Sequence, residues 1–298
     1  MNFSIPYLGE TLAFITAIVW AFAVILFKKS SETVHPIALN LFKNTMAFIL
    51  FIPTMLLFKE SLFRAVPFNE YLLLIFSGFI GIGIGDTLFF ASLSIIGAGL
   101  SSIVSCVYCP VIIAMSIIWL KETLSILQVI GIILIILAML LTINWKEKLQ
   151  ITRKKLLLGI SLGILADIAM AGGVVMIKPL LVRSPLLWST EIRLVGGLLG
   201  LIIILLILPS RYKIVSSLFI SKGWKFTIIS SFLGAYIAMV TWLAGMKFTQ
   251  VSIASALNQT SNIFIFLFAA LLLKEPVTLQ RIIAIILAVS GSLMAALG

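Results

Sequence analysis

Charged residues, histidine and cysteine are all scarce in this sequence, and each shortage excludes a class of protein. Lysine, arginine, aspartate and glutamate make up only 10% of the 298 residues, whereas a typical soluble domain has about 25%. One histidine (His35) and two cysteines (Cys106 and Cys109) are too few to hold a structural metal cluster. We therefore predict that the chain is not a soluble domain and has no metal site.

The two cysteines have the spacing of a redox CxxC motif, but they lie inside an apolar segment. Such a motif gains its meaning from the strand–helix setting of a soluble redox fold, which this segment does not offer. Two small packing residues are the favoured interpretation. We predict no cofactor for this chain.

Apolar residues, in contrast, make up 62% of the chain and form long uncharged stretches. Stretches such as 126–143 and 194–208 approach the roughly 18–20 residues that a helix needs to cross a bilayer. Barrel strands would be only about ten residues long and would alternate polar and apolar side chains. The sequence therefore predicts an all-α polytopic membrane protein, with helices at 10–28, 36–58, 69–95, 98–119, 123–144, 156–180, 185–208, 224–247, 251–273 and 277–297.

The formal net charge of +11 would suggest a nucleic-acid partner in a soluble protein. Here most basic residues fall in short loops between predicted spans, where they contact headgroups, so we predict a lipid bilayer and no nucleic acid as partner. The first residues lack a basic region and a small-residue cleavage site, so residues 10–27 are interpreted as a span rather than a signal peptide.

The loop charges also bear on orientation. With ten helices the two termini share one side of the membrane. If that side is the cytoplasm, most basic residues face outside, including the linker 144–155. The positive-inside rule therefore favours termini outside the cell, although a miscounted helix would change the balance. In the rejected case, with both termini in the cytoplasm, the outside loops would contain the linker together with Arg211, Lys213, Lys222 and Lys225. The cytoplasmic loops would contain only Lys59, Arg64, Lys121, Lys178, Arg183 and Lys247.

The sequence repeats itself at an offset of 153 residues. Leu120-Lys121-Glu122 recurs as Leu273-Lys274-Glu275, each time between two apolar stretches. Each copy has five predicted spans, and an odd number places the copies upside-down relative to each other, as in many secondary transporters. We predict a first repeat at 1–144, a basic linker at 145–155 and a second repeat at 156–298. The same offset pairs Phe79 with Phe232, Gly81 with Gly234, Ala91 with Ala244 and Ser102 with Ser255.

These features resemble the drug/metabolite transporter superfamily, specifically its ten-helix EamA-type branch. The likeness rests on the Lys-Glu steps, on Phe-Phe-Ala-Ser-Leu at 89–93 followed by Gly97-Ala98, and on a basic residue early in the second helix of each repeat, Lys43 and Arg193. It implies two inverted five-helix repeats around a central cavity, with the fifth and tenth helices peripheral. It also implies transport of small metabolites by rocking of the repeats.

Ionisable side chains inside predicted spans are the first candidates for the transport site, because each costs a few kcal/mol to place in a bilayer. Lys43, flanked on its helix by Asn40 and Asn44, could bind a substrate carboxylate or phosphate, or could pair with Asp86. Asp86 follows Gly81-x-Gly83-x-Gly85, where a neighbouring helix can approach closely. It could couple transport to protons, grip a substrate amine or remain in a salt bridge.

Three more ionisable residues lie in the second repeat. Asp167, among small residues near the middle of its helix, is a candidate for cavity lining or proton coupling. Glu191 and Arg193 are two positions apart, so they point about 200° away from each other on a helix. We expect at least one of them to lie near the headgroups, and Arg193 is the better cavity candidate because it mirrors Lys43 at an offset of 150. Met239 matches Asp86, so the second repeat has no acidic counterpart.

Each repeat also has a polar stripe on its fourth helix. Buried amides and hydroxyls need hydrogen-bond partners, which a hydrated substrate pathway supplies. Hydrogen bonds between helices are the alternative, at only about 0.6 kcal/mol each. We favour a cavity face, and we expect Pro110 to kink the first of these helices. The stripes are Ser102, Ser105, Cys106 and Cys109, and Ser255, Asn258, Gln259 and Asn262, and the aromatic candidates for the cavity are Trp20, Tyr108, Tyr236 and Trp242.

These patterns predict a secondary transporter of a small polar or zwitterionic metabolite in a prokaryotic plasma membrane. An amino acid or a related compound is the leading substrate, and export is favoured by the resemblance. Coupling would use H⁺, since the chain has no ATP-binding motif, and facilitated diffusion would need no coupling residue.

Multidrug or quaternary-amine transport is the alternative if Asp86 or Glu191 lies unpaired in an aromatic pocket. An intramembrane enzyme lacks a nucleophile–base set, and a structural or receptor-like protein would have no cavity between the stripes. The oligomeric state stays open.

Overall fold

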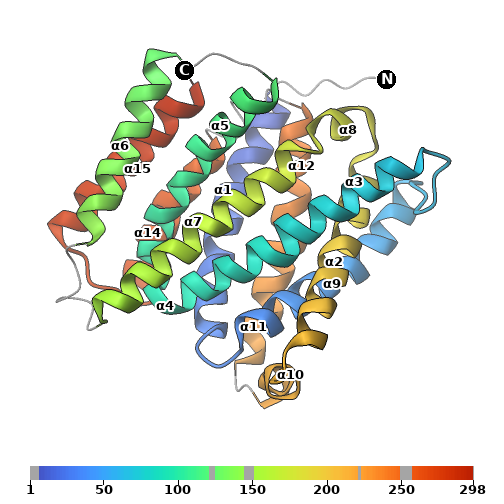
Figure 1. The fold of residues 1–298 in the computed structure, drawn as a ribbon, viewed down its shortest axis with the longest axis horizontal. Helices are drawn as coiled ribbons and strands as arrows, with labels where there is room; N and C mark the ends of the chain where they lie inside the picture. Colours follow the sequence, from blue (N-terminus) through green and yellow to red (C-terminus); the bar gives the residue numbers. More distant parts are fainter. Residues whose placement is uncertain (1–6, 121–124, 144–150, 221–222, 249–256, 298) are drawn as a thin grey trace.

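The chain folds into a bundle of helices. The computed structural model describes residues 7–120, 125–143, 151–220, 223–248 and 257–297, and within these ranges every regular element is a helix (Figure 1). The first half of the chain contains α1 (Leu8–Ser30), α2 (Pro36–Leu57), α3 (Phe68–Gly78), the π-helix η1 (Phe79–Gly85), α4 (Asp86–Val104), the 3₁₀-helix η2 (Ser105–Val107), α5 (Tyr108–Leu120) and α6 (Ile126–Ile143).

The second half contains the corresponding helices in the opposite direction. Figure 1 shows α1 starting at the end of the bundle where both termini lie, whereas α7 starts at the other end and returns to it. The elements are α7 (Arg153–Val175), α8 (Lys178–Arg183), α9 (Leu186–Ile207), α10 (Arg211–Ile220), α11 (Trp224–Ser231), the π-helix η3 (Phe232–Ile237), α12 (Ala238–Phe248), α14 (Ser261–Leu272) and α15 (Leu279–Leu297).

This is an all-α polytopic membrane protein built from two inverted repeats. Among the described residues, six helical segments are long and apolar enough to span a bilayer, and three shorter apolar helices accompany them. One of the six, Phe68–Ile112, is 45 residues long, about twice the length that a bilayer requires. It is broken at Gly97, whose positive φ of 79° only glycine adopts at low cost, and the chain turns there from α4 back toward α5.

The clearest departures from the predicted helices lie in the second repeat. α7 begins at Arg153 rather than at 156, because the Thr152 side chain caps it by accepting the Lys155 N–H at 3.4 Å. It ends at Val175 rather than at 180, since Pro179 has no N–H to continue the helix and opens the short α8 instead. α10 was not predicted, because its ten residues are too few and too polar to read as a span.

Small residues let the helices of the two repeats pack closely. A Cβ added to Gly78 of α3 would lie 1.9 Å from the carbonyl oxygen of Arg193 in α9, and one added to Gly196 would lie 2.0 Å from that of Ile75. These contacts hold α3 and η1 against α9. α6 and α15 pack on each other at the edge of the bundle (Figure 1), the peripheral position that the resemblance implies for the fifth and tenth helices.

Candidate functional site

A cavity of about 230 Å³ lies between helices of both repeats. Its lining comes from α1, α2, η1, α4, η2, α5, α7, α9, η3, α12 and α14, so neither repeat forms it alone. Most of the residues predicted from the sequence contribute to the wall. They are Trp20, Lys43, Asp86, Ser105, Tyr108, Asp167, Arg193, Trp242, Asn258, Gln259 and Asn262.

The two π-helices shape the wall at equivalent positions. η1 begins at Phe79 and η3 at Phe232, which are the residues paired by the 153-residue offset. Gly81 and Gly234, also paired by that offset, both line the cavity. A π-turn widens the helix and interrupts its regular hydrogen bonds, and such turns occur often at functional sites. The repeated Phe-x-Gly pattern therefore marks a distorted turn that faces the cavity in each repeat.

Lys43 and Asp86 form an ion pair at the cavity wall. Lys43 Nζ lies 2.6 Å from Asp86 Oδ2, and it also donates to Asn44 Oδ1 at 3.3 Å. The side chains are 3% and 15% exposed, so the pair is largely removed from solvent. This geometry matches the salt bridge that the sequence left open as the alternative to substrate binding by Lys43.

Asn40 and Asn44 hold α2 against η1 and do not line the cavity. The Asn40 amide donates to the carbonyl of Ile82 at 2.9 Å and to Thr87 Oγ1 at 2.9 Å. Asn44 Nδ2 donates to Asn40 Oδ1 at 2.6 Å. The Asn40 amide thus satisfies a carbonyl within the π-helix that regular helical geometry would otherwise have paired, and Asn44 holds the Asn40 side chain in place.

Arg193 enters the cavity without an ion pair among the described residues. Its Nε donates to Ser77 Oγ at 3.0 Å, and its Nη2 lies 3.6 Å from the position of a Cβ added to Gly81. The same added Cβ would lie 3.8 Å from the Cα of Met170 in α7. The guanidinium therefore lies beside η1 near α7, in the wall of the cavity.

Asp167 lies on α7 one turn before Met170, and it is only 3% exposed. Its Oδ2 is buried and has no hydrogen-bond partner among the described residues, and its carboxyl group forms no ion pair there. The cavity wall thus contains one cation, Arg193, and one acid, Asp167, that form no ion pair within the described chain. Tyr108 lines the same cavity.

The polar stripe of the second repeat faces that of the first. Asn262 Nδ2 donates to Gln259 Oε1 at 2.8 Å and to Cys106 Sγ at 3.3 Å, so the stripes meet across the repeat boundary. Asn258 Oδ1 is buried without a partner in the described chain. The Ser102 hydroxyl donates a hydrogen bond to the carbonyl of Gly99 in its own helix, and Ser102 does not line the cavity. Ser255 and the Lys121–Glu122 step lie outside the described residues.

Pro110 is preceded by a tightened turn rather than by a wide kink. Proline cannot donate to the carbonyl four residues earlier, that of Cys106. The helix adopts 3₁₀ geometry at Ser105–Val107, immediately before it. This turn places Ser105 and Tyr108 in the cavity wall. Cys106 and Cys109 are buried thiols, and the described residues contain no group of side chains suited to a metal ion.

The aromatic candidates divide into two groups. Trp20 and Trp242 line the cavity, and the Trp20 ring lies 6.1 Å from that of Phe89, a lining residue that the sequence did not single out. Tyr236 does not line it; its hydroxyl lies 2.6 Å from Thr54 Oγ1 and its ring packs on Phe51. Thr16, Met170, Met239 and Ser261 also line the cavity, and no sequence signal separates them from ordinary packing residues.

Glu191 and Arg193 are both enclosed within the bundle, near the start of α9. Glu191 is fully buried and Arg193 is 9% exposed. α9 packs against α3 and η1 and also against α2, and its residues from Leu187 to Leu194 are all buried, so residues there that point in different directions are both enclosed. Both carboxylate oxygens of Glu191 lack a hydrogen-bond partner in the described chain, and Glu191 does not line the cavity.

Comparison with known proteins agrees with this architecture. The model of the EamA-like transporter family matches residues 7–144 and 157–297, that is, both repeats. The chain belongs to the EamA-like transporter family. This EamA-like protein also superposes on a solved crystal structure with a TM-score of 0.71 over 97% of this chain and 96% of that chain. Their sequences are 17% identical, so this likeness shows the fold alone. No curated protein matches the chain.

Proposed function

We propose that this transporter moves a small zwitterionic metabolite, an amino acid or a related compound, across a prokaryotic plasma membrane. The observation that carries the proposal is the cation and the acid in one cavity wall, Arg193 and Asp167, that form no ion pair within the described chain. An arginine suits a carboxylate, which it can bind through two parallel hydrogen bonds, and a carboxylate suits an ammonium group. A zwitterion neutralises both charges at once and leaves no net charge in the low-dielectric interior.

The Lys43–Asp86 ion pair supports the same assignment. Because each of these residues neutralises the other, neither presents an uncompensated charge to a ligand. The remaining wall combines the amides of Asn258 and Gln259 with the aromatic rings of Trp20 and Trp242. Amides and rings suit a polar metabolite with a partly apolar side chain. Alternating access, by rocking of the two repeats around this site, follows the general behaviour of inverted-repeat transporters.

Asp167 is the better candidate for proton coupling than Asp86. A proton can bind the Asp167 carboxyl group without breaking an ion pair, whereas protonation of Asp86 would leave Lys43 buried and unpaired. Coupling to the inward proton gradient would favour export of the substrate in exchange for H⁺. Facilitated diffusion would show the same substrate specificity without proton movement.

Ligand-induced thermal stabilisation of the purified protein tests the substrate class. Each charged hydrogen bond contributes about 1.5–3 kcal/mol, so Arg193→Gln should weaken binding of an amino acid by about tenfold to more than a hundredfold. Asp167→Asn should do the same, and the melting-temperature shift should fall accordingly. Arg193→Gln should spare amines without a carboxylate, and Asp167→Asn should spare carboxylic acids without an amine.

Glu191→Gln supplies the matched control, because Glu191 is a buried acid outside the cavity. It should leave the binding constant unchanged. Equal losses in Glu191→Gln and Asp167→Asn would refute the zwitterion site. Proton movement into proteoliposomes on addition of the substrate, abolished by Asp167→Asn, would support coupling.

Quaternary-amine transport is the second candidate, and the aromatic wall favours it. Asp167 is an unpaired acid, and Trp20, Trp242 and Tyr108 line the same cavity. Aromatic faces bind organic cations through cation–π attraction. Stabilisation by choline-like amines that survives Arg193→Gln and disappears in Asp167→Asn, with no stabilisation by amino acids, would establish this function instead.

A further inference from the structure

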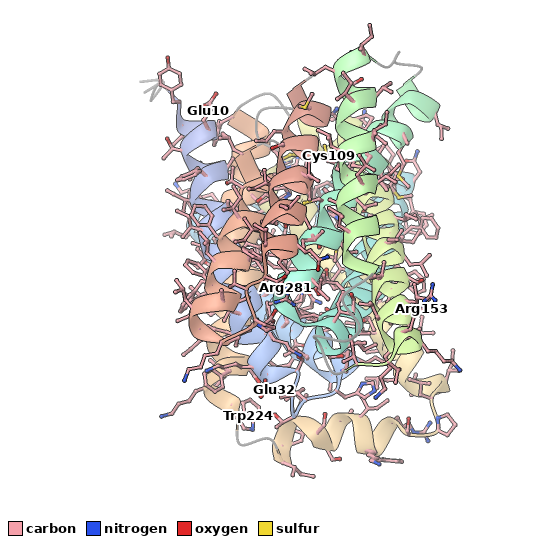
Figure 2. All side chains as sticks on the ribbon, turned by 90° about the vertical axis from the view of Figure 1, so that its left-hand side faces the viewer. Glu10, Glu32, Cys109, Arg153, Trp224 and Arg281 are labelled. Carbon is pink, nitrogen blue, oxygen red and sulfur yellow. The ribbon has the colours of Figure 1, made fainter. Side chains whose placement is uncertain are left out.

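α10 lies across one end of the bundle rather than along it. Figure 2 shows the helix lying horizontally beneath the spans, beside the labelled Trp224, and Figure 1 shows it end-on at the same end. It connects α9, which ends there, to α11, which starts there. A helix in this position lies at the depth of the lipid headgroups.

The inner face of α10 fixes it to the bundle. Ile214 and Leu218 are 4% and 7% exposed and belong to the apolar core cluster that also contains residues of α1, α2 and α4. Ser217 Oγ accepts the backbone N–H of His35, at the start of α2, at 3.0 Å. α10 is therefore a docked part of the fold with one defined face turned outward.

The outward face combines exposed apolar rings and chains with basic groups. Tyr212, Phe219 and Ile220 are 79%, 72% and 77% exposed, and Arg211 and Lys213 beside them are exposed as well. The Arg211 guanidinium lies over the Tyr212 ring at 5.4 Å. Exposed aromatic residues next to lysine and arginine are typical of helices that lie in the interface of a membrane with anionic lipids.

The two ends of the bundle differ in charge. Figure 2 labels Glu32, Trp224 and Arg153 at the α10 end and Glu10 at the other. The helix ends and turns that meet at the α10 end carry a clear excess of basic residues, namely Lys28, Lys29, Arg153, Lys154, Lys155, Arg211, Lys213, Lys225, Lys274 and Arg281, against Glu32 and Glu275. The opposite end is closer to balance, with Lys59, Arg64, Lys178, Arg183 and Lys247 against Glu10, Glu60 and Glu70.

We propose that α10 and the basic turns beside it bind the anionic phospholipid headgroups of the cytoplasmic leaflet. Positive charge collects on the cytoplasmic side of membrane proteins, and the cytoplasmic leaflet attracts it. This assignment places both termini on the external side. It does not depend on the substrate proposed above, because it uses only the outer surface of the bundle.

The assignment also orients the cavity. The lining residues of α7, Asp167 and Val174 among them, lie in the half of that helix farther from α10. The lining residues of α12 and of the segment that leads into α14, such as Trp242 and Asn258, lie toward the same end. The assignment places these lining residues toward the external side of the membrane.

Lipid-dependent melting of the full-length protein tests the binding surface. The probe is phosphatidylglycerol titrated into detergent micelles at low salt, with phosphatidylcholine as the neutral comparison. Each basic side chain near an anionic surface contributes about fivefold in affinity. Arg211→Gln/Lys213→Gln/Lys225→Gln should therefore raise the phosphatidylglycerol concentration for half-maximal stabilisation by roughly a hundredfold. Phosphatidylcholine should stabilise wild type and variant equally.

The matched control removes the same net charge from the opposite end, in Lys59→Gln/Lys178→Gln/Lys247→Gln. This variant should keep the phosphatidylglycerol response of the wild type. Equal responses from the two triple variants would overturn the proposal, since net charge rather than α10 would then govern lipid binding. High salt should abolish the wild-type response, because exposed charges are screened within a few ångströms.

Cysteine labelling in intact cells tests the orientation separately. The native thiols, Cys106 and Cys109, are buried, so the background is low. Ser216→Cys on α10 should react with a membrane-impermeant maleimide only after permeabilisation, whereas Ser61→Cys at the opposite end should react in intact cells. Reaction of Ser216→Cys in intact cells would place α10 outside and overturn the assignment to the cytoplasmic leaflet.

Discussion

The carboxylate of Glu275 joins the two repeats, and its removal gives a sharp test of the fold. Glu275 Oε1 accepts the backbone N–H of Ala98 at 2.9 Å, and Oε2 accepts that of Gly99 at 3.2 Å. These N–H groups open the helical segment that follows the turn at Gly97. Arg281 Nη1 lies 3.4 Å from Glu275 Oε2, so the carboxylate also balances a cation that is only 3% exposed.

Glu275→Gln should lower the free energy of unfolding by about 2–4 kcal/mol. Hydrogen bonds to a charged group contribute about 1.5–3 kcal/mol each, and the glutamine amide retains one neutral acceptor in place of two charged ones. Arg281 would in addition lose the charge that compensates it. At about 2–4 °C per kcal/mol for a chain of this size, the melting temperature should fall by about 5–12 °C.

The assay is thermal unfolding of the purified protein in one detergent, followed by intrinsic tryptophan fluorescence. Glu32→Gln is the matched control, because Glu32 is an exposed glutamate at the same end of the bundle (Figure 2), and it should melt with the wild type. A Glu275→Gln protein that melts within about 1 °C of Glu32→Gln would refute the bridging role. Glu275→Asp should fall between them, since its shorter side chain cannot reach both N–H groups.

Three further changes test separate features. Gly78→Ala should prevent folding or lower the melting temperature by more than 10 °C, because its Cβ would lie 1.9 Å from the Arg193 carbonyl; Gly172→Ala, whose nearest neighbour would be 3.5 Å away on a flexible side chain, should be tolerated in the same thermal assay. Glu191→Gln should raise the melting temperature by about 2 °C or more, because it removes a fully buried carboxyl group whose oxygens have no partner in the described chain; a lower melting temperature would show an unseen partner. His35 caps α2 through Nδ1, and burial lowers the pKa of this imidazole below its usual value of 6.5. Its contribution to stability should therefore be complete above about pH 7 and be lost as the pH falls toward 5, a slope that a series of melting curves should show in wild type and not in His35→Asn.

The sequence was sufficient to predict the architecture because its signals are local and periodic. Long uncharged stretches fix the positions of most spans, and the repeat at an offset of 153 fixes the relation between the halves. The structure adds the physical origin of the repeat. Phe79 and Phe232 begin the two π-helices, and the Lys274–Glu275 step supplies the carboxylate that caps the helix after Gly97. These residues, which the offset identifies, thus have structural roles: the two phenylalanines begin the π-helices and the glutamate caps a helix.

What the sequence could not show depends on contacts between distant segments. From the sequence, Lys43 could form a salt bridge or contact the substrate, and only the distance between Lys43 Nζ and Asp86 Oδ2 in the structure shows the salt bridge. The burial of Glu191 required knowing that α9 packs against α2 as well as against α3 and η1. Asn40 and Asn44 share a face with Lys43 on a helical wheel, but Asn40 binds η1 and Asn44 binds Asn40, and the irregular turn of η1 has no periodic signal in the sequence.

The asymmetry of the cavity includes one position where an acid of the first repeat has no acidic counterpart in the second. Lys43 and Arg193 are the corresponding cations of the two repeats, and Lys43 is neutralised by Asp86 of its own repeat. The residue that corresponds to Asp86 in the second repeat is Met239, which lines the cavity and cannot balance a charge. Arg193 therefore makes its hydrogen bond to a neutral hydroxyl, that of Ser77, and forms no ion pair within the described chain. The zwitterion proposal rests on this difference between the repeats, because methionine in place of an acid leaves the arginine at the cavity without an ion-pair partner from its own repeat.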